Sequence, residues 1–313
     1  MTLPSAPTPP AAIGTRFFLV GYLPTYIALL YLLVLAWAVR GPGTSFTRAW
    51  RTATQLTAAQ IVFVALLVLI IAVLLTPFQL GLVRVLEGAW PDRLGGDWSL
   101  ERQRDRRKRL LAAAEPKSDD PAEMWRAGTA GLRLRTRYPL AEHLVRATRL
   151  GNILAAMEDR AGRDYGLDAV VAWPRLYPLL SAATKAIVDD RRTTLDMTAR
   201  LSGTSFVAAI ASAAILYDAR WWLLLVLAPL VVAVVAYLGA LPAALAYSES
   251  VQAAFDLHHL ALGPAFGLAR PKDSADERVA NRQLCDLWRQ SIPHPFTYAA
   301  AEPAKQPSGG ATA

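Results

Sequence analysis

The sequence has little cysteine, little lysine and few charged residues. These scarcities limit the disulfides, the metal sites and the class of protein that are possible. Cys285 is the single cysteine, which excludes an intrachain disulfide and a metal site built from several cysteines. Of 33 basic residues only five are lysine, a bias that with abundant alanine, leucine and proline is typical of a GC-rich coding sequence. Charged residues make up 19% of the chain and hydrophobic residues 54%, so the composition favours a membrane protein over an ordinary soluble one.

The common catalytic motifs are missing as well. The chain has no Gly-Lys-Ser/Thr phosphate loop, no dinucleotide glycine fingerprint, no His-Glu-x-x-His zinc helix and no Gly-x-Ser-x-Gly elbow. Asp256 and His258 are weak candidates for holding a metal, because the adjacent His258 and His259 project about 100° apart on a helix. The sequence therefore predicts no cofactor and no metal site.

Four runs without a charged residue predict four transmembrane helices. The first, Phe17 to Val39, is 23 residues long and lies between Arg16 and Arg40. At about 1.5 Å per residue it is long enough to cross a bilayer, and too long for the apolar part of a signal peptide, which is the competing interpretation. The second, third and fourth runs are Leu56 to Val83, Leu201 to Tyr217 and Trp221 to Tyr247.

The third run differs from the others in its small side chains. Pairs such as Ala208 with Ser212 and Ala209 with Ala213 are four residues apart, a spacing that allows close helix approach. We expect this helix to pack inside the bundle, whereas the fourth run, with Trp221 and Tyr247 at its ends, is suited to lipid.

Short connections arrange these runs as two hairpins. Asp218 to Arg220 joins the third and fourth runs, and Arg40 to Gln55 joins the first two. The predicted fold class is an all-α integral membrane protein with four transmembrane helices as two hairpins plus a helical cytoplasmic body. The stretch from Arg84 to Arg200 holds 22 basic and 17 acidic residues, which places it and both termini in the cytoplasm; the arginines in the first outer loop favour the opposite orientation.

The resulting organisation has six parts. They are a disordered tail (1–15), the first transmembrane hairpin (16–83), the cytoplasmic helical segment (84–200), the second transmembrane hairpin (201–247), C-terminal cytoplasmic helices (248–300) and a second disordered tail (301–313). Within the cytoplasmic segment we expect a loop at Ala113 to Ala122, an amphipathic helix at Leu140 to Arg160, and a helix from Ala182 that runs into the third span. The one strand signal covers Leu132 to Tyr138.

The stretch from Glu101 to Arg109 carries six basic and two acidic residues. One interpretation is contact with anionic lipid headgroups, and the other is a solvated helix start. The residues predicted to contact lipid are Arg102, Arg104, Arg106, Arg107, Lys108 and Arg109.

A second candidate surface surrounds an aromatic segment at Trp173 to Pro178. Its aromatic and aliphatic side chains are suited to docking a partner, although packing against the helix that contains Leu150 is the favoured interpretation. The partner-binding surface that we predict consists of Arg149, Asn152, Asp168, Trp173 and Arg175.

Four short blocks carry a resemblance to a known family. Thr148-Arg-Leu-Gly-Asn152, Tyr165-Gly-Leu-Asp168, Trp173-Pro-Arg-Leu-Tyr-Pro178 and Phe255-Asp-Leu-His258 are similar to blocks in an uncharacterised family of multi-pass membrane proteins from GC-rich Gram-positive bacteria. The resemblance covers about residues 148 to 260. It implies a location in the bacterial cytoplasmic membrane and brings no activity or substrate.

Three functional hypotheses follow. The leading one is a non-enzymatic scaffold or regulator that recruits a cytoplasmic protein partner through its helical body and contacts anionic lipid, without binding nucleic acid. The alternative is a homo-oligomeric ion channel formed by the third span, since the spans lack the ionisable groups that coupled transport requires. The third is a membrane-associated enzyme with Asp256, His258 and Asp168 as acid/base groups.

Overall fold

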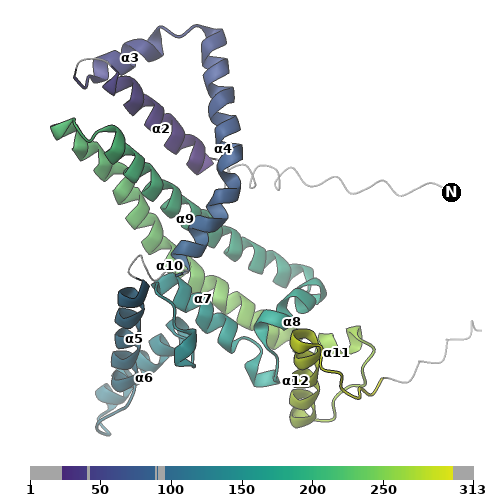
Figure 1. Cartoon of the computed structure of the whole chain (residues 1–313). Helices are drawn as coiled ribbons and strands as arrows, with labels where there is room; N and C mark the ends of the chain where they lie inside the picture. The colour runs from purple at the N-terminus through teal and green to yellow at the C-terminus, as the bar shows by residue number, and fades with distance from the viewer. Residues whose placement is uncertain (1–22, 41–42, 89, 91–95, 299–313) are drawn as a thin grey trace, which may run out of the picture. The chain divides into compact units, whose positions relative to one another are not determined.

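The computed structural model describes residues 23–40, 43–88, 90 and 96–298, without the side chains of 76–80. All regular elements in this part of the chain are helices, and Leu268 and Tyr298 form an isolated antiparallel bridge. The predicted all-helical class is confirmed (Figure 1). The strand signal at Leu132 to Tyr138 is wrong, because this stretch ends a helix. Both predicted tails lie outside the described residues.

Apolar helices form where the sequence has uncharged runs. They are α2 (Leu23–Val39), α4 (Ala58–Leu86), α9 (Ala182–Ile215) and α10 (Leu227–His258). Three helical stretches, Ala58–Leu75, Ala182–Ile215 and Arg220–Ala265, are long and apolar enough to cross a membrane. The described part of the first predicted span is the 17-residue α2, and its residues 17–22 lie outside the description.

The connections differ from the prediction in two places. The first connection contains a short helix, α3 (Phe46–Thr54), which packs against α2. The helix α10 continues past Tyr247 to His258 and is preceded by a 3-10 turn at Arg220–Val226. The helix expected at Ala182 does run without a break into the third span, as predicted.

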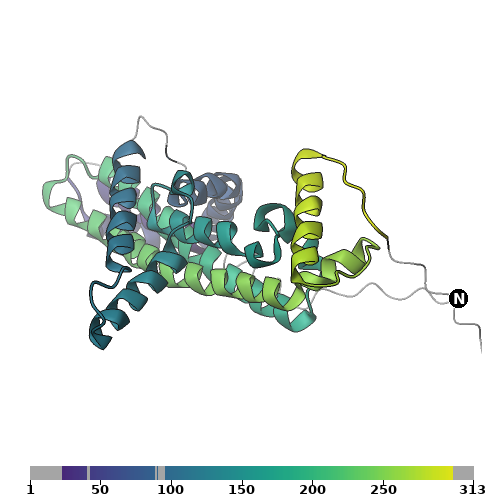
Figure 2. The ribbon, with the colours of Figure 1, turned by 90° about the horizontal axis from the view of Figure 1, so that it is seen from below.

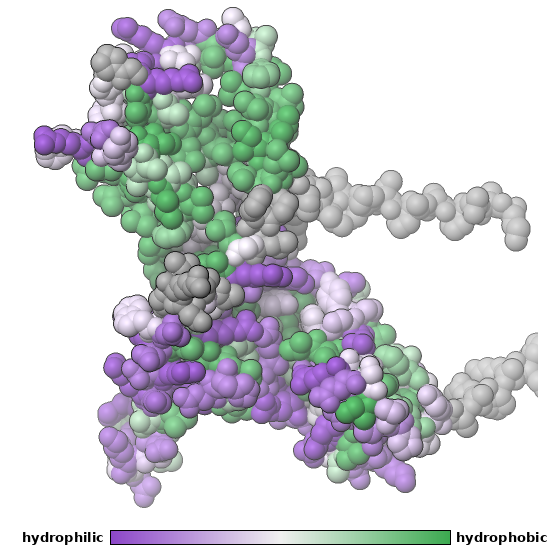
Figure 3. Space-filling view, viewed as in Figure 1, coloured by the Kyte–Doolittle hydropathy of each residue, from purple (hydrophilic) through white to green (hydrophobic). Residues whose placement is uncertain are grey.

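The small-residue face of α9 is buried within the chain. In its apolar window 44% of the residues are buried, against 11% for the α4 window and 17% for the α10 window. Ser202 donates a hydrogen bond to the carbonyl of Ala233 on α10, and Gly203 lies against Leu82 of α4. The helix α9 also carries the exposed apolar residues Phe206, Val207 and Ile210, and further exposed apolar residues lie on α2, α4 and α10. Figure 3 shows a continuous hydrophobic surface.

Two helices of the polar segment pack against each other. They are α5 (Gly96–Ala113) and α6 (Pro121–Arg137), and Figure 2 shows α6 running obliquely to α5. The helix α6 ends at Arg137 because Pro139 forces the residue before it, Tyr138, into an extended backbone conformation.

The helix α7 (Arg149–Arg160) begins nine residues later than predicted, because the preceding segment forms a joint between helices. Asn152 is fully buried, and its side-chain amide makes three hydrogen bonds of 2.8 Å to the backbone of Arg146 and Thr148. The Thr148 hydroxyl accepts a hydrogen bond from the amide of Gly151 and donates one to the carbonyl of Leu86 at the end of α4. We call residues 146–152 the joint.

Among the described residues, 157–186 with 250–298 form a second compact unit, and 23–156 with 187–249 form the first. The boundary runs through α7, α9 and α10. The second unit also contains α8 (Ala169–Leu176), α11 (Leu262–Ala265) and α12 (Ser274–Gln290). Its turns use Gly162 and Gly166 at positive φ, and a Cβ at Gly166 would lie 2.5 Å from the carbonyl of Arg278.

The joint predicts a sharp difference between two glycine substitutions. A Cβ at Gly151 would lie 1.8 Å from the Glu87 carbonyl oxygen, whereas a Cβ at Gly128 in α6 meets nothing within 4 Å. We expect Gly151→Ala to destabilise the protein by about 1–3 kcal/mol through overpacking, and Gly128→Ala to stabilise it by about 0.5–1 kcal/mol. Thermal unfolding of both variants in one detergent, followed by circular dichroism, measures this; equal transition temperatures would contradict the joint.

Candidate anion-binding pocket

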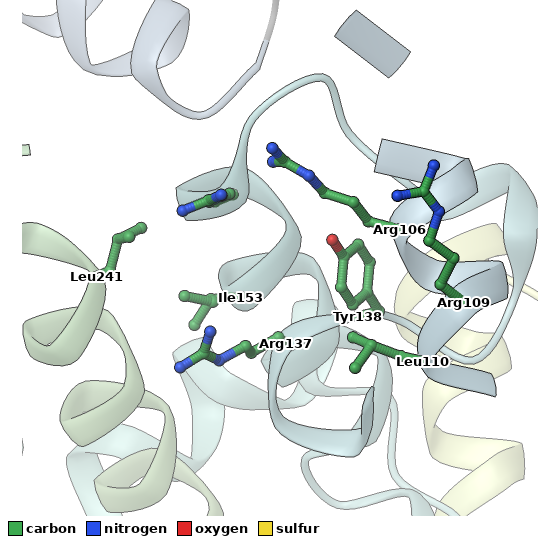
Figure 4. A pocket seen from close by; sticks show the side chains of 8 residues that line it. Arg106, Arg109, Leu110, Arg137, Tyr138, Ile153 and Leu241 are labelled. Carbon is green, nitrogen blue, oxygen red and sulfur yellow. The ribbon is translucent and has the colours of Figure 1, made fainter. Parts of the chain in front are cut away.

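A cavity of about 270 Å³ lies in the first unit between α5, α6, α7 and α10 (Figure 4). Four arginines and Tyr138 supply its polar lining, and three aliphatic side chains supply the rest. The lining residues are Arg106, Arg109, Leu110, Arg137, Tyr138, Arg149, Ile153 and Leu241. None of the eight is acidic.

One face of the helix α5 forms one side of the pocket. Arg109 and Leu110 are three and four residues after Arg106, so the three side chains share one face of the helix. The acidic residue Asp105 projects about 100° away from Arg106, but it is four residues before Arg109 and therefore lies next to it on the helix surface. Asp105 is not among the residues that line the pocket.

The end of α6 places the next two lining residues. Arg137 is the last residue of the helix, and the extended backbone at Tyr138 directs the phenol ring beneath α5. The Tyr138 hydroxyl donates a buried hydrogen bond of 3.0 Å to Oε1 of Gln103. Burial raises the pKa of Tyr138 above its usual value, so this residue stays neutral at physiological pH.

The joint and the apolar helix α10 complete the lining. Arg149 is the first residue of α7, and Ile153 is one turn further along the same face. Ile153 belongs to a core cluster with Leu150, Leu154 and Ala244, against which Leu241 also packs. The pocket thus has a wall that is continuous with the core between α7 and α10.

The guanidinium group of Arg106 feels the like charges of Arg149 and Arg109. Partial burial, followed by the field of Arg149, lowers the pKa of Arg106 below its usual value. Figure 4 shows Arg106 reaching across the Tyr138 ring toward the side of the pocket where Ile153 and Leu241 lie. Like charges in helical contact repel each other, so an anion between the guanidinium groups would relieve this repulsion.

The structure distributes the six residues that were predicted to contact lipid. Arg106 and Arg109 line the pocket. Arg102 lies over the Trp98 ring at 5.3 Å, and Arg107 donates hydrogen bonds to the carbonyls of Pro139 and Leu140. The basic segment is therefore partly a pocket wall and partly a means of fastening α5, and its lipid contact stays a prediction.

The five predicted partner-binding residues are divided between the two units. In the first unit Arg149 lines the pocket and Asn152 holds the joint. In the second unit Asp168 caps α8 at the amide of Val170 and forms an ion pair with Arg289, Trp173 packs against Phe255, and Arg175 lies 4.6 Å from the Trp288 ring. These contacts give Asn152, Asp168, Trp173 and Arg175 structural roles, and partner binding by the five residues stays a prediction.

The residues considered for metal binding or catalysis each have a partner of their own. Nε2 of His258 accepts a hydrogen bond from the amide of Ser181, and its Nδ1 lies 3.2 Å from the carbonyl of Ala254. Asp256 accepts a hydrogen bond from the Tyr165 hydroxyl. No cluster of three or more metal-ligating side chains occurs among the described residues.

Sequence reasoning missed five of the eight lining residues, namely Leu110, Arg137, Tyr138, Ile153 and Leu241. A usable signal was present for two of them. In Arg137-Tyr138-Pro139 the proline ends a helix and forces the residue before it into an extended conformation. A basic and an aromatic side chain therefore lie together at a helix end, which is a sequence signal for a binding site.

Comparison with protein-family models, with curated proteins and with solved structures gave no match. The resemblance to the multi-pass family therefore stays a prediction that rests on the four sequence blocks.

Cys285 of α12 offers a direct check of the second unit. Its side chain is buried, and the amide of Asp168 lies 3.3 Å from its sulfur. Burial raises the pKa of the thiol to about 11. Because only the thiolate reacts, we expect maleimide to label Cys285 roughly two orders of magnitude more slowly at pH 8 than an exposed cysteine, with a rate that rises as the pH approaches 11.

A matched control is Glu115→Cys, at an exposed position, in a Cys285→Ala background. Equal labelling rates of the two cysteines in the folded protein would contradict the burial of Cys285.

Proposed function

We propose that the chain is a multi-pass protein of the bacterial cytoplasmic membrane, and that its membrane-proximal helical body is a non-enzymatic regulator that recruits a partner when the arginine pocket binds an anion. The observation that carries the proposal is the convergence of Arg106, Arg109, Arg137 and Arg149 on one cavity whose lining has no carboxylate. Arginine guanidinium groups bind phosphate and carboxylate oxygens in pairs, with charge-assisted hydrogen bonds.

The proposed topology has four spans in two hairpins, α2 with α4 and α9 with α10. Contact between α2 and α4 supports the first hairpin. The exposed apolar residues of α4 and α10 support a lipid environment for both. The surplus of basic residues between Arg84 and Arg200 supports a cytoplasmic location for the helical body and both termini.

The pocket favours regulation over the two other hypotheses. An acid/base enzyme commonly uses His, Glu, Asp, Lys, Tyr or Cys directed into a shared site, and the polar lining of this pocket consists of four arginines and a tyrosine. The channel hypothesis relied on the small-residue face of α9. That face packs inside the chain, so the geometry gives it no support.

The topology predicts opposite labelling of two introduced cysteines in a Cys285→Ala background. Thr54→Cys lies at the end of α3, on the proposed outer side, and Glu115→Cys lies in the loop between α5 and α6; both positions are exposed. We expect an impermeant maleimide to label Thr54→Cys in intact cells and Glu115→Cys only after permeabilisation. The reverse pattern would invert the topology, and labelling of both in intact cells would reject it.

Anion binding is tested by thermal unfolding of the full chain in detergent with added pyrophosphate, at constant ionic strength. A ligand that binds only the folded state at 100 times its dissociation constant adds about 2.7 kcal/mol to stability. We expect the wild-type protein to be stabilised, and the Arg106→Gln/Arg149→Gln double variant to lose this response because two of the four cations are gone.

The matched control is Arg135→Gln, which removes an exposed arginine of α6 that does not line the pocket. It should respond to pyrophosphate as the wild-type protein does. Stabilisation of the double variant to the same extent would place the anion elsewhere and overturn the proposed function.

A further inference from the structure

The pocket has an apolar wall that leads out along a candidate membrane span. Leu241 lies in the helical stretch Arg220–Ala265, which is long and apolar enough to cross a membrane. On the same face of α10, at intervals of three and four residues, follow Leu238, Val234 and Val231, which are all exposed apolar side chains. The face therefore connects the arginines to a surface suited to hydrocarbon.

The size of the cavity favours a head group over a larger ligand. Sites for small organic molecules commonly measure about 300–1,000 Å³, and this cavity of about 270 Å³ lies just below that range. A glycerol phosphate head group fits in a cavity of this volume, whereas a whole phospholipid with two acyl chains does not. The remainder of the ligand has to lie outside the cavity.

The number of cations favours a group with more than one negative charge. A phosphodiester carries one charge, whereas a phosphomonoester carries about 1.5 to 2 at neutral pH. Four arginines line the cavity with no acidic side chain among the eight lining residues. A dianion compensates this charge better than a monoanion does.

We infer that the pocket binds the phosphomonoester head group of a membrane lipid, a class represented by phosphatidic acid. The phosphate lies among Arg106, Arg137 and Arg149, and an acyl chain lies along the face of α10 that starts at Leu241. This inference rests on the proposed anion-binding function and specifies its ligand. A free phosphomonoester shares the head-group chemistry but lacks the acyl chain, so the two sources can be separated.

The test is native mass spectrometry of the full chain in a mild detergent with four added probes. They are dioleoyl phosphatidic acid, dioleoyl phosphatidylglycerol, glycerol 3-phosphate and pyrophosphate. We expect phosphatidic acid to bind at least about tenfold more tightly than either phosphatidylglycerol or glycerol 3-phosphate. Phosphatidylglycerol lacks the second negative charge and so loses a charge-assisted contact, and glycerol 3-phosphate lacks the acyl chain and so loses the apolar contact.

Three variants locate the site. Arg149→Gln should weaken phosphatidic acid binding about tenfold, and Arg149→Lys should restore it only in part because lysine cannot form the paired contact. Leu238→Ser should weaken lipid binding and leave pyrophosphate binding unchanged, since it alters only the exposed apolar face beyond the pocket. Arg135→Gln should change neither, and circular dichroism shows which variants remain folded.

Each other result overturns a defined statement. Equal binding of phosphatidylglycerol and phosphatidic acid overturns the phosphomonoester assignment. Glycerol 3-phosphate binding as tightly as phosphatidic acid overturns the lipid assignment and leaves the proposed function standing. If neither pyrophosphate nor any of the lipids binds, both the proposed anion-binding function and the lipid assignment are overturned.

Discussion

A single buried amide holds the segment on which the first unit depends. The three backbone hydrogen bonds of Asn152 fix residues 146–148, and this short stretch in turn receives the Ser99 hydroxyl of α5 at Ala147 and reaches the end of α4 through Thr148. Without the amide, the N–H and the carbonyl of Arg146 would lose these hydrogen bonds, at about 1–3 kcal/mol for each group left unsatisfied. The carbonyl of Thr148 would keep its hydrogen bond from the backbone N–H of Asn152. The positions of α4, α5 and α7 therefore depend on hydrogen bonds to backbone groups, and Arg107 of α5 adds its own to the carbonyls of Pro139 and Leu140.

Rigid backbone contacts of this kind allow like charges to be brought together. Each like-charge pair on a helix face costs a few tenths of a kcal/mol, about 0.2–0.5, and burial of Arg106 adds a desolvation cost that appears as its lowered pKa. The repulsion is small beside the cost of breaking the joint. The chain can therefore hold Arg106 and Arg149 in the same pocket without a carboxylate between them. An anionic ligand that binds there would relieve the electrostatic repulsion between the two guanidinium groups.

The sequence predicts the apolar helices well because their signal is local. Uncharged runs locate α4, α9 and α10, and small residues identify the buried face of α9. The start of α7 was misplaced because the periodicity continues upstream of Thr148, while tertiary contacts hold that stretch outside the helix. The pocket could be anticipated only in part: basic residues on α5 are visible, but the approach of Leu241, more than 100 positions away, depends on packing that periodicity does not encode.

The residues of the four sequence blocks stabilise the fold, whereas ordinary arginines on polar helix faces form the pocket. Because Gly151 has no side chain, the backbone at the end of α4 can lie against it, and Gly166 allows the same close approach of the backbone of α12. The fully buried Phe255 packs beside Gly162. These positions belong to or adjoin the blocks that suggested a family resemblance. A binding surface chosen from distinctive residues therefore selects structural ones such as Asn152, whose loss would abolish binding by disrupting the joint. Arginines on polar helix faces reveal their role only when the fold brings them together, so a test of function has to change the guanidinium groups and leave the joint intact.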